Sequence, residues 1–105
     1  MKEKYNEIFK LKKMLTDAGI PFYMHELFDG YQICYPEQNT SQTPDVRECS
    51  VIEHEGSYGH SEDKLEIMGL LTDEELQNGG VVGHLSAEEV FSRIQKHFIE
   101  NNKMV

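Results

Sequence analysis

The sequence predicts an α+β fold in which a small antiparallel sheet of three to four strands packs against an N-terminal helix and two C-terminal helices. Three observations support this prediction. A lysine-rich amphipathic pattern opens the chain, several short β-prone runs follow it, and the capping sequences "LTDEEL" and "LSAEEV" come near its end. Helices before and after a run of strands typically cover one face of a sheet. A chain of 105 residues has the length of one domain, so 1–105 is expected to fold as a single unit.

The N-terminal segment has helical periodicity. Apolar residues recur at spacings of three and four from Tyr5 to Ala18, with lysines between them, which is typical of an amphipathic helix. Gly19 can adopt the left-handed conformation that ends a helix, and Pro21 cannot continue one. We therefore expect the helix to end at "AGIP".

The middle of the chain predicts strands. The runs "PFYMHEL" and "YQICYP" are joined at Asp29-Gly30, and Asp-Gly between β-prone runs indicates a hairpin. Residues 36–45 hold two prolines and no aliphatic or aromatic residue, so they are expected to form an exposed connection. A third strand is predicted in "VRECSVIEH". The run "KLEIMGLL" is too short to classify by periodicity and fits a fourth strand or a short buried helical turn.

Two capping boxes mark the C-terminal helices. Thr72 is followed three residues later by Glu75, and Ser86 by Glu89, which is the spacing of a reciprocal cap. The first helix is expected to be short because "NGG" follows it. The second is expected to continue to a frayed end at residues 101–102.

The net charge of −9 is concentrated in the middle of the chain. Residues 14–95 contain sixteen acidic and three basic residues, whereas the two ends contain seven basic and three acidic residues. Binding to a phosphate backbone depends on clustered lysine and arginine, so we expect no direct binding of nucleic acid. Acidity commonly keeps a small protein soluble, and a dense acidic face also mimics nucleic acid in a basic groove of a partner.

Hydropathy and cysteine content predict the compartment. The sequence contains no apolar run long enough for a membrane span or a secretory signal, so we expect a cytoplasmic protein with no membrane partner. Cys34 and Cys49 are too few for a disulfide framework. If they lie on neighbouring strands, they are expected to be reduced, half-buried core residues.

The stretch "HEGSYGH", residues 54–60, is the candidate site. Its glycines permit positive φ and expose backbone amides that form an anion-binding nest, and its tyrosine and histidines add a stacking ring and hydrogen-bond donors. We predict a site for a small anionic ligand, formed by Arg47, His54, Gly56, Ser57, Tyr58, Gly59 and His60. The alternative, a plain turn between two buried segments, stays open.

Metal binding and catalysis fit this stretch less well. His54 and His60 lack the paired spacing of a structural zinc site, so no metal or other cofactor is expected. Ser57 and a histidine are residue types of a hydrolytic triad, but Glu55 and Gly59 do not form the G-x-S-x-G elbow around it. We therefore assign no catalytic residues and expect a binding protein rather than an enzyme.

Three stretches of the sequence resemble a known family: "LKKMLTDAGIPFYMHELFDGYQICYP", "CSVIEHEGSYGHSEDKLEIMGLLT" and "VVGHLSAEEVFSRI". The chain resembles small uncharacterised proteins encoded by phages, prophages and mobile elements of Gram-positive, Clostridia-like bacteria. The resemblance covers nearly the whole chain and implies an accessory protein that acts in the bacterial host cell. A recurring role of such proteins is to counter host defence without catalysis.

Two mechanisms of counter-defence suit the residues. The first is sequestration of a small nucleotide-type signalling ligand, in a homodimer or larger homo-oligomer, because one loop of a small domain buries only part of such a ligand. The alternative is an acidic protein inhibitor that mimics nucleic acid and blocks a host defence or DNA-binding protein. A small hydrolase ranks third.

Overall fold

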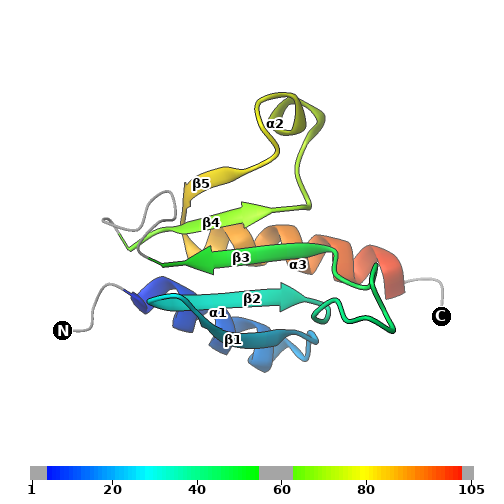
Figure 1. Ribbon diagram of the computed structural model, residues 1–105, viewed down its shortest axis with the longest axis horizontal. Coiled ribbons are helices and arrows are strands. Elements are labelled where there is room, and N and C mark those ends of the chain that lie inside the picture. Colours follow the sequence, from blue (N-terminus) through cyan, green and yellow to red (C-terminus); the bar gives the residue numbers. More distant parts are fainter. Residues whose placement is uncertain (1–4, 55–62, 103–105) are drawn as a thin grey trace.

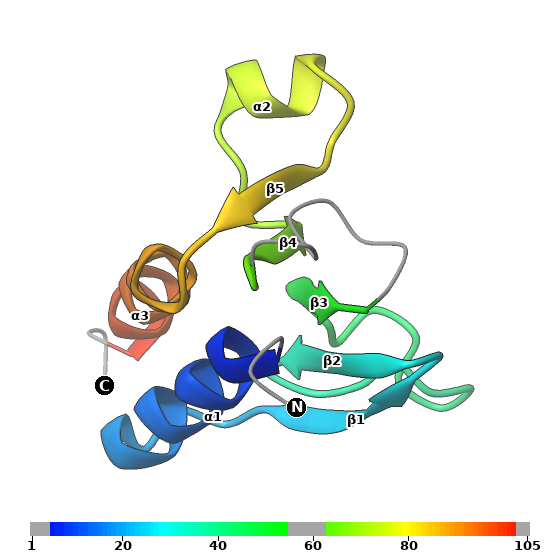
Figure 2. The same ribbon diagram turned by 90° about the vertical axis from the view of Figure 1, so that its left-hand side faces the viewer.

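The chain forms a single sheet covered on one face by two helices. The computed structural model describes residues 5–54 and 63–102, and within them five strands form an antiparallel sheet of order β1-β2-β3-β4-β5. Figure 1 views the sheet from its uncovered face, and Figure 2 shows both long helices on the opposite side. The elements are α1 (Asn6–Ala18), β1 (Tyr23–Leu27), β2 (Gly30–Tyr35), β3 (Cys49–Glu53), β4 (Leu65–Met68), α2 (Asp73–Gln77), β5 (Val82–Leu85) and α3 (Ala87–Asn102).

Helix α1 ends as the sequence predicts. Ile8, Leu11 and Leu15 form its fully buried stripe against the sheet. Gly19 has φ 72°, and its amide donates to carbonyl oxygens of the last turn. The left-handed residue stops the helix because it turns the chain while satisfying the terminal carbonyl groups.

The β1–β2 hairpin is confirmed, with Phe28 and Asp29 in its turn. Phe28 adopts φ 56°, a conformation that is uncommon for a bulky residue. Gly30 follows the turn and lies against the backbone of Glu53 and His54. A Cβ at Gly30 would overlap the carbonyl oxygen of Glu53, so only glycine fits there.

The two faces of the sheet differ in polarity. Ile33, Val51 and Ile67 are opposite one another on β2, β3 and β4, and all three are fully buried beneath the helices. The other face carries a hydrogen-bonded row in which Gln32 contacts His25 at 2.6 Å and Ser50 at 2.6 Å. This alternation is typical of an antiparallel sheet with one solvated face.

The α+β class and the antiparallel sheet are confirmed, but the predicted strand count was too low. The additional strand is β5, which spans only four residues and contains Gly83. His84 within it has φ 61°, and its pairing with β4 shifts register. These irregularities disrupt the two-residue periodicity by which a strand is identified in a sequence.

The prediction of two C-terminal helices packed on the sheet was wrong for the first of them. Both capping boxes are present, with side-chain and backbone bonds between Thr72 and Glu75 and between Ser86 and Glu89. However, α2 has no buried residue and stands on an arm between β4 and β5 (Figure 1). Of the two C-terminal helices only α3 covers the sheet, because α3 presents a long apolar stripe and the five-residue α2 does not.

The remaining segments connect these elements. Residues 36–45 link β2 to β3 and are exposed at every position except Pro36 and Gln38, which are half-buried. Cys34 and Cys49 are buried, unbridged and on neighbouring strands. None of the helices in the described ranges is long and apolar enough to cross a bilayer.

Candidate functional site

The structure describes the two flanks of the predicted loop site. His54 directly follows β3, and Asp63 comes two residues before β4. Gly56, Ser57, Tyr58, Gly59 and His60, which carry the predicted anion-binding nest, lie outside the described residues. The described residues around the candidate site are those that surround these flanks.

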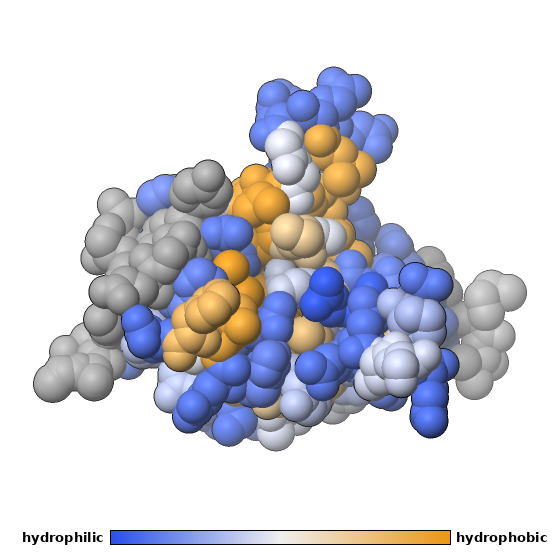
Figure 3. Space-filling model, in the orientation of Figure 1, coloured by the Kyte–Doolittle hydropathy of each residue, from blue (hydrophilic) through white to orange (hydrophobic). Residues whose placement is uncertain are grey.

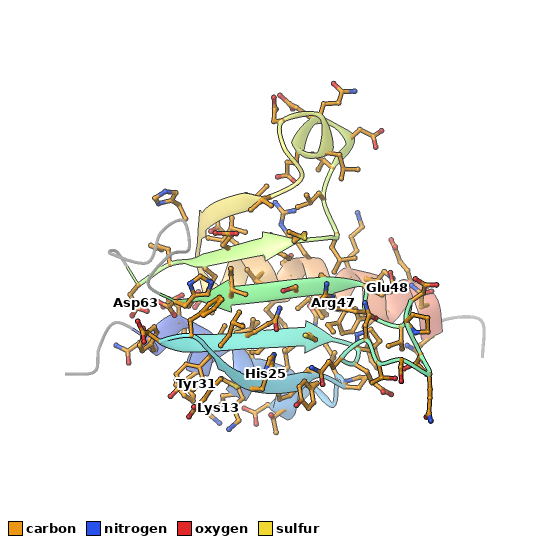
Figure 4. All side chains as sticks on the ribbon, in the orientation of Figure 1. Lys13, His25, Tyr31, Arg47, Glu48 and Asp63 are labelled. Carbon is orange, nitrogen blue, oxygen red and sulfur yellow. The ribbon has the colours of Figure 1, made fainter. Side chains whose placement is uncertain are left out.

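Arg47 does not lie near the flanks of the predicted loop site. It precedes β3, whereas His54 follows it, so the two residues lie at opposite ends of the strand. At a rise of about 3.3 Å per residue, the intervening chain separates them by roughly 20 Å. Figure 4 shows Arg47 and Glu48 at one end of the sheet and Asp63 at the other. The backbone amide of Arg47 donates to Asn39 Oδ1 at 2.8 Å, within the polar connection.

An aromatic residue that the sequence analysis missed lies beside His54. The Phe28 side chain is 83% exposed, and its ring centroid lies 5.2 Å from that of His54 in an edge-to-face arrangement. Figure 3 shows apolar surface at this end of the sheet, beside the segment drawn in grey. The sequence did contain an indication of this. An aromatic residue directly before Asp29-Gly30 falls in the hairpin turn, where it is far from the core and is expected to be exposed.

Two carboxyl groups at this end of the sheet hold the N-terminus of α1. Asp63 accepts hydrogen bonds from the amides of Asn6 and Glu7, each at 3.2 Å. Glu53 Oε1 accepts a third from the amide of Ile8 at 3.3 Å. These amides have no partner inside the helix and carry its positive dipole end. The protein's own carboxyl groups therefore occupy the place where an anion would otherwise bind.

Glu53 is a neutral acid in this arrangement. Its side chain is fully buried, and burial together with the neighbouring Asp63 carboxyl group raises its pKa from 4.5 to about 9. Within the described part of the chain, Glu53 Oε2 accepts no hydrogen bond. A buried carboxylate oxygen without a donor favours the protonated form of Glu53.

Glu7 extends the cluster to the second long helix. Its Oε1 accepts a hydrogen bond from the Ala87 amide at 2.6 Å, at the start of α3. We call Glu7, Glu53 and Asp63 the carboxyl junction. It supplies negative charge and no cation, so a phosphate near His54 would depend on donors from residues 54–60. The described residues favour contact with a flat ring more directly than contact with an anion.

The opposite end of the sheet holds a second polar cluster. Tyr35 Oη is hydrogen-bonded to His97 Nδ1 at 2.8 Å, and His97 Nε2 lies 3.7 Å from Glu48 Oε1. Burial is the main cause that raises the pKa of Tyr35, and it raises the pKa of Cys49 to about 12. A thiol with that pKa is protonated at neutral pH, so Cys49 is not an activated nucleophile.

A groove of about 850 Å³ runs between α3 and the arm that carries α2. Arg93 spans it, donating to both carboxylate oxygens of Glu75 at 2.9 and 2.8 Å and to the Leu70 carbonyl at 3.0 Å. This pairing lowers the pKa of Glu75 to about 2. Arg93 therefore joins the arm to α3, and the Glu75 carboxylate neutralises its charge.

Comparison with known proteins identifies no relative of this chain. The chain matches no protein-family model, and no curated protein or solved structure is significantly similar to it. A function for the protein therefore rests on the geometry and chemistry of its own residues.

Metal coordination receives no support from the described residues. Among residues 5–54 and 63–102, no group of three or more histidine, cysteine, aspartate or glutamate side chains converges as a metal site would require. The carboxyl junction is directed at backbone amides instead. Its chemistry is that of a helix cap.

Proposed function

We propose that the protein is a phage-type accessory binding protein that sequesters a small nucleotide-type signalling ligand without catalysis, in counter-defence within the cytoplasm of a bacterial host. The observation that carries this proposal is the exposed Phe28 ring beside His54, at the border of residues 55–60. A nucleotide has a flat base and an anionic group. Phe28 and His54 suit the base, and the amides of residues 56–59 suit the anion.

The exposure of Phe28 supports a binding role. At 83% exposed, its ring contributes little to the core, whereas a stacked base would cover it and contribute on the order of 1–3 kcal/mol. The carboxyl junction holds both ends of the neighbouring segment against α1. Anchored ends reduce the entropy lost when a loop is ordered around a ligand.

The proposal is non-catalytic and includes self-association. Burial raises the pKa of both the Cys49 thiol and the Tyr35 hydroxyl. Neither group therefore supplies a reactive anion at neutral pH. Phe28 is exposed, His54 is half-buried and their rings stand edge-to-face, so they would cover only one side of a base. A homodimer or larger homo-oligomer would supply the second wall.

A thermal-shift screen with linear and cyclic nucleotides and ADP-ribose derivatives tests this function. A ligand that binds the folded state raises the melting temperature by mass action. We expect Phe28→Ala to abolish most of the shift and the control Met68→Ala to retain it, since Met68 is also exposed, at 52%, but lies at the other end of the sheet. Chromatography should recover the ligand unchanged. No shift with any ligand, or equal shifts in both variants, would rule out this site.

The second candidate is an acidic inhibitor of a host defence or DNA-binding protein. It is favoured by Asp73 and Glu74, which are exposed on the projecting arm while Glu75 is neutralised by Arg93. An arm that projects acidic groups can enter a basic groove. Capture of a basic host protein at low salt should weaken in Asp73→Asn/Glu74→Gln but not in the control Glu37→Gln/Asp45→Asn. Equal capture by both variants would exclude the arm.

A further inference from the structure

The two edges of the sheet are built differently. β5 pairs with β4 through a register shift and contains His84 at φ 61°, and such irregularity disfavours the addition of another strand. β1 forms an unbroken register with β2 over five consecutive pairs, from Tyr23–Cys34 to Leu27–Gly30. In the described residues no strand pairs with its outer side. The β1 edge therefore presents a regular row of backbone donors and acceptors.

An aromatic groove lies between this edge and α1. A space of about 410 Å³ is bordered by Phe9, Phe22, Met24 and Tyr31, among other residues. The rings of Phe9 and Tyr31 pack edge-to-face at 4.8 Å, and the Tyr5 ring packs against Tyr31 at 5.6 Å. Phe9 is 42% exposed, so the groove has an apolar wall that the fold leaves partly uncovered.

The charge at the mouth of the groove is positive on the side of α1. Lys10 is paired with Glu88 at 2.6 Å, and Lys13 with Asp17 at 3.0 Å. Lys12 has no carboxylate partner among the described residues, and its Nζ lies 6.0 Å from the centroid of the Phe9 ring. Glu26 is the acidic residue that also lines the groove. Figure 4 shows Lys13, His25 and Tyr31 gathered at this edge of the molecule.

We propose that the β1 edge and the neighbouring groove bind an extended acidic segment of a partner protein, which adds to the sheet as a sixth strand. Backbone hydrogen bonds to Tyr23–Leu27 would hold the segment. Its alternate side chains would face α1, because side chains of a strand point to opposite faces in turn. An apolar side chain fits against Phe9 and Tyr31, and an acidic one two residues away fits Lys12.

Charge favours this occupant over a second copy of the chain. If two copies paired through β1, their α1 helices would lie on the same side of the joined sheet. Each groove would then meet the other copy's α1, whose Lys12 repeats the positive charge of the groove and does not complement it. This interaction surface involves the strand edge, whereas the proposed ligand site involves the turn and residues 54–60. The two inferences can therefore fail separately.

The test uses a labelled peptide, Val-Thr-Glu-Thr-Phe-Thr-Glu-Thr-Val, as the probe for the full-length protein. Fluorescence anisotropy measures its affinity, and amide NMR locates its contacts. We expect binding with shifts and slowed hydrogen exchange in Tyr23–Leu27. Lys12→Glu should weaken binding at least about fivefold. The control Lys96→Glu makes the same charge change on α3 and should alter the affinity less than about twofold.

Strand addition is distinguished from simple groove binding by N-methylation. The probe is methylated on alternate amides in each of the two possible frames, because only one edge of an added strand faces β1. One frame should abolish binding and the other should retain it. Phe9→Ala should weaken the unmethylated probe, while Ile99→Ala, which truncates an exposed apolar residue on α3, should not.

Several results would overturn the proposal. These are no binding at millimolar probe, equal binding in the two methylation frames, and equal affinity for a probe with lysine in place of glutamate. Protection of Tyr23–Leu27 that rises with protein concentration alone would identify the occupant as a second copy and refute the acidic partner.

Discussion

Glu53 and Asp63 meet at the N-terminus of α1, where one carboxyl group binds the Ile8 amide and the other binds the amides of Asn6 and Glu7. The pair therefore joins the end of β3 and the approach to β4 to the first helix. Glu53 is protonated in this arrangement, because burial and the adjacent Asp63 carboxyl group raise its pKa to about 9.

The buried acid predicts an unusual dependence of stability on pH. The pKa of Glu53 rises from 4.5 to about 9 on folding, so between these values the folded state holds a proton that the unfolded state has released. The contribution of Glu53 is complete below pH 4.5 and falls as the pH rises towards 9. Glu53→Gln should remove this slope and raise the free energy of unfolding at pH 7 on the order of 1–3 kcal/mol.

Urea denaturation at pH 5, 7 and 9 measures this effect. Glu26→Gln, which changes an exposed carboxyl on β1, is the matched control and should retain the wild-type slope. Parallel pH profiles for Glu53→Gln and the wild type would show that Glu53 is ionised in the folded protein.

Asp63 is predicted to stabilise the start of α1. Asp63→Ala removes the acceptor for two helix amides and should lower the free energy of unfolding by about 1–2 kcal/mol. Hydrogen exchange at Asn6 and Glu7 should accelerate. The control Asp17→Ala lies in the last turn of the same helix, where a carboxylate faces the negative dipole end and contributes little. A comparable loss in both variants would refute the capping role.

Arg93 is predicted to hold the α2 arm. Arg93→Ala removes two bonds to Glu75 and one to the Leu70 carbonyl, so hydrogen exchange over residues 72–78 should accelerate while the central strands keep their protection. Arg93→Lys should rescue the arm only in part, because lysine cannot form the paired contact. Lys96→Ala is the control on the same helix. Unchanged exchange in Arg93→Ala would mean that the arm is held by other contacts.

The fold was predictable wherever a local signal decided the structure. Gly19, the Asp29-Gly30 turn and the capping box at Thr72 each act through neighbouring residues, and each forms as expected. β5 was not predictable, because its pairing with β4 is non-local and Gly83 interrupts its pattern. The projection of α2 away from the sheet was not predictable either, because it also depends on a non-local contact. Arg93 meets Glu75 only after α3 has packed on the sheet.

The site was less predictable than the fold for a geometric reason. Arg47 and His54 are near in sequence, but an extended strand between them places them at opposite ends of the sheet. Phe28 and His54 are far apart in sequence, but the β1–β2–β3 pairing brings their rings together. Sequence spacing therefore wrongly suggested that Arg47 lies near His54, and it gave no indication that Phe28 does.

Phe28 is predicted to lower the stability of the fold. Its ring is 83% exposed and its backbone has φ 56°, so the residue combines an exposed apolar surface with a strained conformation. Asparagine tolerates the left-handed region better. Phe28→Asn should therefore raise the free energy of unfolding by about 0.5–1 kcal/mol and weaken the binding of the nucleotide-type ligand.

Leu70→Asn is the control, because Leu70 has φ 55° but packs against the core. In this variant the loss of apolar contacts should outweigh any relief of backbone strain. Denaturation in urea compares the two variants. If Phe28→Asn is destabilised as Leu70→Asn is, then Phe28 serves the fold, and the case for a binding role at this turn is lost.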